Sequence, residues 1–424
     1  MSIQQIISKL RNQEKGLTLK WPIEGPRRVP SEVYTDREIY NREQDYIFKS
    51  RTWNYVGLTT EVKDIGDFIQ TFVGEVPVIL VRDRRNKFRV FVNRCTHRGA
   101  QICHQEQGNV KLFTCLYHEW SFNLDGTLVG MPFRRGIDGK GGMSPDFDST
   151  EHGLEQLNVT ERHGVVFASF SFEIESFEEY LGPGILVYFD RVCNGKTLRV
   201  IGKMQHRVHA NWKLQVENVK DPFHAALLHS FFLTFGIWRS DQETHVKVDK
   251  HGRSSVLVST ATFKQAQNEQ FKERLNSQNG FSLNDKRLIE YQSEYEHGTG
   301  AVMTIWPNLI FLQQLNCLVM RHVKPDGPDS CIKTWTFFGY ESDSPELTQK
   351  RLYQANLFGP SGLVTIDDNE ILAMVQIGSA ASPNSVAVLE AGNGEGDADH
   401  MMTESAIRGF YKYYKKIMGY EDDE

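Results

Sequence analysis

The chain has 424 residues, more than one compact domain usually holds, which predicts two or three domains. Its hydrophobic share of 40% can supply globular cores, and a net charge of −6 without a basic stripe gives no electrostatic site for nucleic acid. No run of 18 apolar residues occurs and the start lacks the apolar core of a signal peptide, so we expect a cytoplasmic protein without a membrane segment.

Residues 1–44 are expected to form an N-terminal helical segment that packs on the larger domain. A polar start leads into a proline-punctuated stretch at 21–30. From Thr35 onward, apolar residues recur near helical spacing behind an Asp in the first turn, which predicts a helix that ends before Trp53.

Residues 45–168 are expected to form a small antiparallel β domain. Short β-rich runs with period-two patterning, separated by turn residues, indicate strands over 68–76, 77–83, 87–94, 122–130 and 154–170. Asp125-Gly126 marks a hairpin turn, and the glycine-rich, charged stretch 131–147 is predicted to be a long loop.

Within this domain, two short Cys/His pairs stand on either side of a connecting segment. Cys95-x-His97 is followed, after 17 intervening residues, by Cys115-x2-His118. A structural zinc site usually keeps like ligands together, as C-x2-4-C and H-x3-5-H, whereas each pair here is mixed. A mixed pair suits a [2Fe–2S] cluster in which one iron takes both thiolates and the other takes both imidazoles. Zinc is the alternative reading.

Residues 169–424 are expected to form a larger α+β domain with an antiparallel sheet flanked by helices. The predicted strands cover 198–210, 254–263, 301–323 and 331–340. The predicted helices cover 176–192, with an interruption at Gly182-Pro183-Gly184, and 214–235, 345–357, 367–377 and 403–418.

A second metal site is predicted in the stretch that carries Asn218, Asp221, His224 and His229. A cluster of this kind passes single electrons, so a chain that also has a large second domain needs an acceptor for them. Two histidines and one carboxylate form the facial triad of non-haem iron(II) oxygenases. Histidines five residues apart are separated by roughly 140° on a regular helix, so we expect a π-type bulge or kink near residues 226–228.

Aspartates are expected to supply both an outer contact to one of these histidines and the third metal ligand. Asp221 lies one turn before His224 and is expected to accept a hydrogen bond from that ligand's second ring nitrogen. The third ligand is Asp367 or Asp368, at the start of a predicted helix, where one carboxylate can cap the helix while the other binds the metal.

These motifs together resemble the large (α) subunit of Rieske non-haem iron aromatic-ring-hydroxylating oxygenases, in order and spacing from about residue 40 to 415. The resemblance implies a [2Fe–2S] cluster and a mononuclear Fe(II) with O2 as cosubstrate, and Asp221 as an electron-transfer bridge between neighbouring subunits. The implied cluster ligands are Cys95, His97, Cys115 and His118, and the implied iron ligands are His224, His229 and Asp368. It also implies a trimer, often with three small β subunits, and electrons from NAD(P)H through a reductase and a ferredoxin.

Five stretches are together similar to the aromatic-carboxylate branch of that family, the anthranilate, salicylate and terephthalate oxygenases: 194–202, 211–229, 233–241, 354–362 and 403–411. A carboxylate substrate needs a buried cation, for which Arg321 and Arg408 are the candidates, and Asn218 is a further candidate contact. The branch implies dihydroxylation of an ortho-substituted benzoate to catechol. The alternatives are a salicylate-type ring monohydroxylase and, from another class, an electron-transfer Rieske subunit without its own chemistry.

Overall fold

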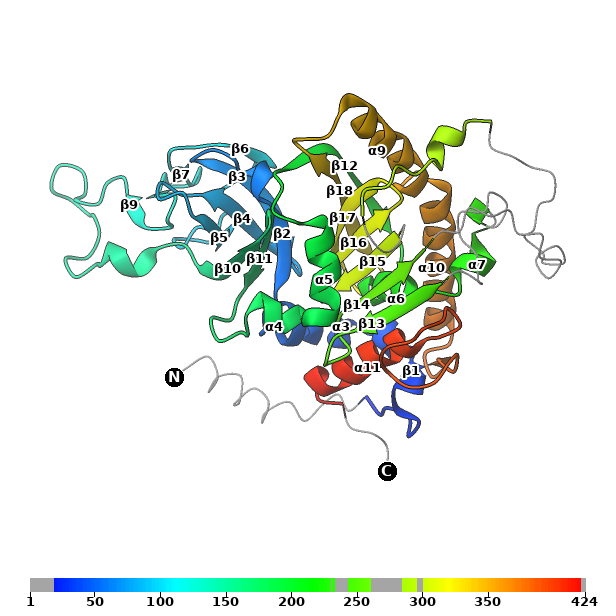
Figure 1. Ribbon diagram of the computed structural model, residues 1–424. Coiled ribbons are helices and arrows are strands. Elements are labelled where there is room, and N and C mark those ends of the chain that lie inside the picture. Colours follow the sequence, from blue (N-terminus) through cyan, green and yellow to red (C-terminus); the bar gives the residue numbers. More distant parts are fainter. Residues whose placement is uncertain (1–18, 230, 233–242, 261–283, 296–299, 421–424) are drawn as a thin grey trace, which may run out of the picture.

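The computed structural model describes residues 19–229, 231–232, 243–260, 284–295 and 300–420. Two seven-stranded antiparallel sheets dominate it, one in each half of the molecule (Figure 1). The α+β class and the antiparallel arrangement expected from the sequence are confirmed.

The N-terminal segment is made of short helical pieces. They are η1 (Gly25–Arg27), α2 (Glu32–Thr35), α3 (Arg37–Glu43) and the π-turn η2 (Gln44–Phe48), and β1 (Arg28–Pro30) pairs with β19 (Val386–Val388). The predicted helix therefore starts close to the expected position and ends before Trp53, but Asp36 interrupts it by capping the Ile39 amide. Trp21 packs against Tyr411 and Tyr414, which anchors this segment to α11 (Ser405–Met418).

The first sheet has the strand order β2-β11-β10-β5-β4-β3-β6. Its strands are β2 (Asn54–Leu58), β3 (Asp67–Val73), β4 (Val76–Arg82), β5 (Phe88–Val92), β6 (Gln107–Asn109), β10 (Gln156–Arg162) and β11 (Val165–Ser169). The short turns η3 (Thr59–Glu61) and η4 (Ser149–His152) flank it, and a three-stranded sheet of β7 (Phe113–Thr114), β8 (Ser121–Phe122) and β9 (Leu128–Gly130) lies beyond it. The stretch 131–147 contains no strand or helix, as predicted.

The predicted hairpin turn at Asp125-Gly126 joins β8 to β9. Gly126 has a φ of +88°, and a Cβ there would lie 2.6 Å from the Phe91 ring, so only glycine fits this turn.

The second sheet has the order β12-β18-β17-β16-β15-β14-β13. Its strands are β12 (Leu198–Val208), β13 (Thr244–Val248), β14 (Ser255–Ser259), β15 (Gly300–Ile305), β16 (Leu309–Gln314), β17 (Cys317–Pro325) and β18 (Cys331–Tyr340). The stretch 301–323 therefore folds as three strands joined by tight turns. Residues 261–263 of the predicted strand 254–263 lie outside the described residues.

Helices cover this second sheet. They are α4 (Phe177–Leu181), α5 (Pro183–Val192), α6 (Trp212–Lys220), α7 (Ala225–Leu228), η6 (Lys286–Leu288), α9 (Pro345–Phe358), α10 (Leu363–Ala381) and α11. The predicted interruption at Gly182 separates α4 from α5. Of these helices, α6 packs on β14, β15 and β17 and also contacts α10, which brings two candidate metal-binding segments together.

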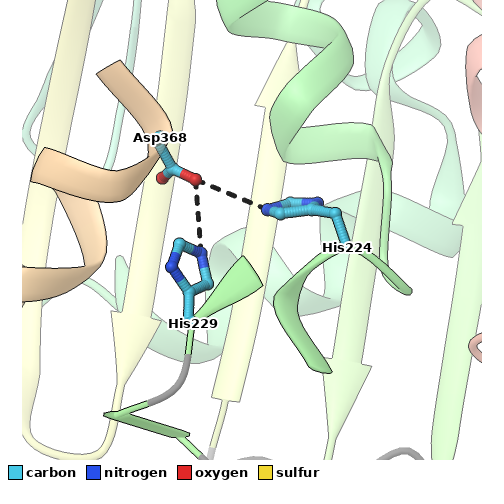
Figure 2. Close-up of side chains that lie close together, drawn as sticks. All are labelled: His224, His229 and Asp368. Atoms are coloured by element: carbon cyan, nitrogen blue, oxygen red, sulfur yellow. Dashed lines mark ion pairs between the residues drawn. The ribbon is translucent and has the colours of Figure 1, made fainter. Parts of the chain in front are cut away.

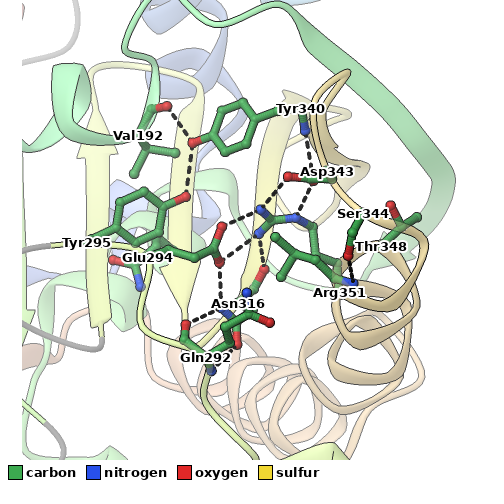
Figure 3. Close-up of polar contacts among 12 residues, drawn as sticks. Val192, Gln292, Glu294, Tyr295, Asn316, Tyr340, Asp343, Ser344, Thr348 and Arg351 are labelled. Carbon is green, nitrogen blue, oxygen red and sulfur yellow. Dashed lines mark hydrogen bonds and ion pairs between the residues drawn. The ribbon is translucent and has the colours of Figure 1, made fainter.

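Two polar contacts fix the parts that surround the second sheet. The Asn308 amide, beyond β15, accepts from the Tyr55 N–H at 2.9 Å and donates to the Tyr55 carbonyl at 3.2 Å, which joins the second sheet to β2. Around α9, Arg351 is buried and pairs with Glu294 and Asp343 (Figure 3), which holds the segment 284–295 against that helix.

The division expected between residues 168 and 169 falls inside β11, directly before its last residue, Ser169, and α4 begins later, at Phe177. The three-stranded sheet, whose β7 and β8 are joined by the loop with Cys115 and His118, lies toward one end of the molecule, whereas α7 and α10 lie toward the other end (Figure 1). No helix among the described residues is both long and apolar enough to cross a membrane.

Candidate metal centres

The two Cys/His pairs occupy two loops with matching backbone geometry. In the β5–β6 loop the Cys95 N–H donates to Ala100 and the Gly99 N–H donates back to Cys95, at 2.7 and 2.9 Å. In the β7–β8 loop the Cys115 N–H donates to Trp120 and the Glu119 N–H donates to Cys115, at 2.9 and 2.8 Å. Each loop is therefore a tight turn that presents its cysteine and histidine side by side.

The four side chains converge with the thiols inside and the imidazoles outside. Cys95 and Cys115 are buried, His97 is exposed and His118 is half-buried. The two imidazole rings have centroids 4.5 Å apart, and His97 stacks on Trp120 at 4.6 Å. Burial and the neighbouring Cys115 thiol raise the pKa of Cys95. The main-chain N–H groups of His97 and Arg98 donate to its sulfur and act in the opposite direction, but the pKa is still raised overall. Two thiols and two imidazoles with sulfur-directed N–H groups fit a Rieske [2Fe–2S] cluster.

Asn93, which sequence reasoning did not single out, holds the first cluster loop in shape. Its amide oxygen accepts from the N–H groups of Ile102 and Cys103, both at 2.9 Å, and its amide nitrogen donates to the Cys103 carbonyl at 3.0 Å. Its position directly after β5 was the only signal in the sequence.

The second candidate centre begins where α6 ends. The helix stops at Lys220, and Asp221 has the extended dihedral angles of a C-cap. His224 and His229 then flank the single turn α7, one before it and one after it. The predicted π-type bulge at 226–228 is wrong, because the chain leaves the helix earlier, at Asp221–Phe223, and residues 230 and 233–235 of the predicted helix 214–235 lie outside the described residues.

His224, His229 and Asp368 converge on one point (Figure 2). The Oδ1 atom of Asp368, on α10, lies 3.5 Å from Nε2 of His224 and 3.2 Å from Nε2 of His229. Two ligand atoms that each lie about 2.1 Å from a metal, at adjacent corners of an octahedron, are about 3 Å apart. The observed distances are close to this value, so the three side chains fit a facial triad.

Outer contacts fix both imidazoles with Nε2 toward this point. Nδ1 of His224 lies 2.7 Å from the main-chain oxygen of Asp221, while the Asp221 carboxylate lies 3.6 Å away. Nδ1 of His229 lies 3.3 Å from Oδ2 of Asp367. Protons on both Nδ1 atoms leave both Nε2 lone pairs free for a metal. The expected contact of Asp221 is therefore made by its carbonyl, and Asp367 supplies a carboxylate to the other histidine.

The electrostatics favour a cation at this point. Burial acts to raise the pKa of Asp368, but the two histidines hold it well below its usual range. Burial acts to lower the pKa of His224, yet Asp221 and Asp368 raise it to about 10. Asn218 donates to Asp368 at 3.1 Å and lies 3.3 Å from Nε2 of His224, so it borders the site.

A cavity opens beside the three side chains, between α6, α7 and α10 on one side and the second sheet on the other. Its apolar lining comes from Val219, Ala225, Phe232, Leu257, Val302, Leu312 and Val364. Apart from the triad, the polar residues that line it are Asn218, Asp221, Gln314 and Arg321.

Arg321 is buried, and no carboxylate in the described part of the chain forms an ion pair with it. Its Nε has no hydrogen-bond partner, and the guanidinium lies 4.2 Å from the centre of the Trp335 ring. Burial lowers the pKa of Arg321 to about 10, so the group keeps its charge at neutral pH. An anion in the cavity would compensate this buried charge.

Arg408 does not line this cavity. Its guanidinium donates to the main-chain carbonyls of Leu389, Ala391, Gly392 and Gly394 at 2.8 to 3.1 Å. These bonds occupy all three guanidinium nitrogens, so the prediction that Arg408 binds substrate is corrected to a structural role.

Comparisons with known proteins agree with both centres. Residues 52–139 match the Rieske [2Fe-2S] domain, and residues 196–420 match the catalytic domain of the ring hydroxylating alpha subunit. The chain is 46% identical over 408 residues to the large oxygenase component of salicylate 5-hydroxylase from a Ralstonia species, which covers 94% of this chain and 96% of that one. It is 40% identical over 410 residues to the large subunit of anthranilate 1,2-dioxygenase from Burkholderia cepacia, with 94% and 95% covered.

Naphthalene 1,2-dioxygenase with indole bound in its active site has the same fold, with a TM-score of 0.78 at 22% identity over 96% of this chain and 95% of that one. The chain belongs to the ring-hydroxylating α-subunit family and is the large, catalytic subunit of a Rieske-type aromatic-ring-hydroxylating oxygenase. It carries a Rieske [2Fe–2S] cluster and a mononuclear iron, and it uses O2 and electrons from NAD(P)H.

Proposed function

We propose that this subunit hydroxylates a single-ring aromatic carboxylate. The proposed cluster ligands are Cys95, His97, Cys115 and His118, and the proposed iron ligands are His224, His229 and Asp368. When bound, the cluster supplies single electrons and the mononuclear iron activates O2.

The observation that carries the proposed substrate class is Arg321. It is a buried, charged guanidinium on the cavity wall with no carboxylate partner among the residues that the structure describes. A bidentate carboxylate matches a guanidinium in geometry and charge. We infer that Arg321 binds the carboxylate and that the apolar lining, including Leu257, Val302 and Leu312, holds the ring and excludes water.

The relatives' names agree with this substrate class, since salicylate and anthranilate are both ortho-substituted benzoates. Two reactions remain candidates. One is anthranilate-type dihydroxylation to catechol, and the other is salicylate-type monohydroxylation, which the 46% identity to a salicylate 5-hydroxylase component favours. Gln314 also lines the cavity and is a candidate hydrogen-bonding partner for the ortho substituent.

We further propose that electrons reach the iron site from a neighbouring copy of the chain. The strand β7, which precedes Cys115 and His118, and the helix α7, which follows His224, lie toward opposite ends of one chain (Figure 1), which argues against transfer within it. In a trimer, Asp221 would lie between His224 and the partner subunit's His118. The names of the relatives describe a large oxygenase component and a large subunit, which suggests that a small subunit accompanies each of them. We therefore propose a small β subunit as a partner of this chain, together with a ferredoxin and an NAD(P)H-dependent reductase.

The test is O2 uptake and product analysis with salicylate, anthranilate and their carboxamides in a system reconstituted with a reductase and ferredoxin. We expect turnover of at least one acid and little turnover of its carboxamide, and 18O2 labelling then counts the oxygen atoms added to the ring. Equal turnover of the acid and its carboxamide would contradict the proposed role of Arg321. Turnover of neither aromatic acid would contradict the proposed substrate class.

A further inference from the structure

A chain of contacts leads from Arg321 to the helix that carries Asp368. Arg321 and Trp335 are paired residues on the adjacent strands β17 and β18, and the guanidinium lies over the indole at 4.2 Å. The Trp335 ring is fully buried, and its N–H donates to Nδ1 of His206, on β12, at 3.1 Å.

This hydrogen bond fixes where His206 carries its proton. A ring nitrogen that accepts a hydrogen bond has no proton, so a neutral His206 is protonated on Nε2. Burial and the nearby Lys333 lower the pKa of His206 to about 4, which keeps the ring neutral at physiological pH. The Nε2–H therefore needs an acceptor on the side that faces α10.

We assign this role to the Asn369 side chain. Its Nδ2 lies 3.1 Å from Nε2 of His206, and its Oδ1 is buried without a hydrogen-bond partner in this orientation of the amide. A half-turn of the amide exchanges its oxygen and nitrogen and gives the oxygen the Nε2–H as a donor. Asn369 follows Asp368 directly on α10, so the contact chain ends next to the proposed iron ligand.

We propose that His206 is a positioning residue that links the Arg321–Trp335 pair to the start of α10 and so sets which ring carbon of the substrate faces the iron. This inference rests on the proposed function, because it takes Arg321 as the carboxylate anchor. With the carboxylate held by Arg321 and the metal by His224, His229 and Asp368, the distance between these two anchors selects the ring position. A displacement of about 1 Å can change a rate by about 100-fold, so a loosened link should mix positions that the native enzyme separates.

The experiment compares His206→Leu, which removes both hydrogen bonds, with His206→Gln, whose amide can accept from Trp335 and donate to Asn369. Gln205→Leu is the matched control, since Gln205 lies on the opposite, exposed face of β12. For each holoenzyme we measure the ratio of ring positions hydroxylated, the product formed per O2 consumed, KM and kcat. Iron content and the dissociation constant of the aromatic acid for the iron-free protein are the readouts that do not depend on turnover.

In His206→Leu we expect the ratio of ring positions and the product per O2 to change by about tenfold, with iron content retained. In His206→Gln we expect both values to return toward those of the native enzyme, and in Gln205→Leu no change. Unchanged product ratios in His206→Leu would overturn the inference, and so would a His206→Gln variant as altered as His206→Leu.

Two further measurements separate this inference from the proposed function. If Arg321→Met leaves the dissociation constant of the aromatic acid unchanged, the proposed function fails first. If Arg321→Met weakens binding but His206→Leu leaves regiochemistry intact, only the positioning role fails. 15N NMR of histidine-labelled protein, with His206→Gln to assign the signal, tests the tautomer directly. A protonated Nδ1 at His206 would contradict the proposed link.

Discussion

The main-chain oxygen of Asp221 lies 2.7 Å from Nδ1 of His224, whereas the Asp221 carboxylate lies 3.6 Å from the same nitrogen. The main-chain oxygen therefore orients the histidine ring, while Oδ1 of the Asp221 carboxylate accepts from the N–H groups of Phe223 and His224 at 3.0 and 3.2 Å. Under the proposed bridging role, the main-chain oxygen of Asp221 would serve metal binding and its carboxylate would serve electron transfer.

Asp221→Asn should leave iron bound and slow electron transfer. The backbone contact to His224 survives the substitution, whereas the negative charge of the proposed bridge to a neighbouring subunit is lost. We expect single-turnover reoxidation of the reduced cluster to slow by more than about tenfold at unchanged iron content. Loss of iron, or a native single-turnover rate, would contradict the bridging role.

Asp367→Asn should weaken iron binding instead. Its carboxylate lies 3.3 Å from Nδ1 of His229 and fixes that ring with Nε2 toward the metal. Loss of such an outer carboxylate typically costs about 10- to 100-fold in metal affinity. Competition with a chelator measures the affinity, the cluster's visible absorption serves as the internal control, and an unchanged affinity would show that the carboxylate is not needed.

Arg321 and Arg408 should respond to substitution in opposite ways. Arg321→Met should weaken an aromatic acid by at least about tenfold and its carboxamide little, because it removes only the cavity cation. Arg408→Met should lower the melting temperature, because it leaves four main-chain carbonyls without their donor, while substrate affinity is retained. Equal effects of Arg321→Met on acid and carboxamide would argue against carboxylate recognition.

Glu217, on α6, should make stability depend on pH. Burial raises the pKa of Glu217 to about 7, although hydrogen bonds from Tyr411 and Tyr34 act in the opposite direction. A carboxyl with a raised pKa in the folded state contributes stability at pH below about 4.5 that is lost as the pH rises through about 7. Glu217→Gln should therefore flatten the fall in melting temperature between pH 5 and pH 8, and an unchanged slope would assign that fall to other groups.

Local motifs predicted much of the site, because cluster ligands two or three residues apart need only tight loops to converge. The order of residues also indicated that His224 and His229 cannot share one regular helix. The sequence did carry a signal for the actual break at Asp221, because Pro222 follows it and disfavours a helical conformation at the residue before it. The Asp221 side chain then accepts from the N–H groups of Phe223 and His224, which fixes the turn locally.

Contacts between distant segments could not be predicted. Arg321 and Arg408 both interrupt apolar stretches, so the sequence could not tell which of them faces the cavity. In the fold, the loop 389–394 covers the Arg408 guanidinium with main-chain carbonyls, which excludes it from substrate binding. Likewise, His206 and Trp335 are 129 residues apart and meet because β12 pairs with β18.

The central claim is that one chain holds a two-iron cluster and a separate mononuclear iron at His224, His229 and Asp368. Iron and acid-labile sulfide analysis of the purified subunit tests it directly, with His224→Ala beside the native protein. The account predicts three irons and two sulfides per native chain, and two irons with full cluster absorption in His224→Ala. Two irons in the native protein, or three in the variant, would contradict it.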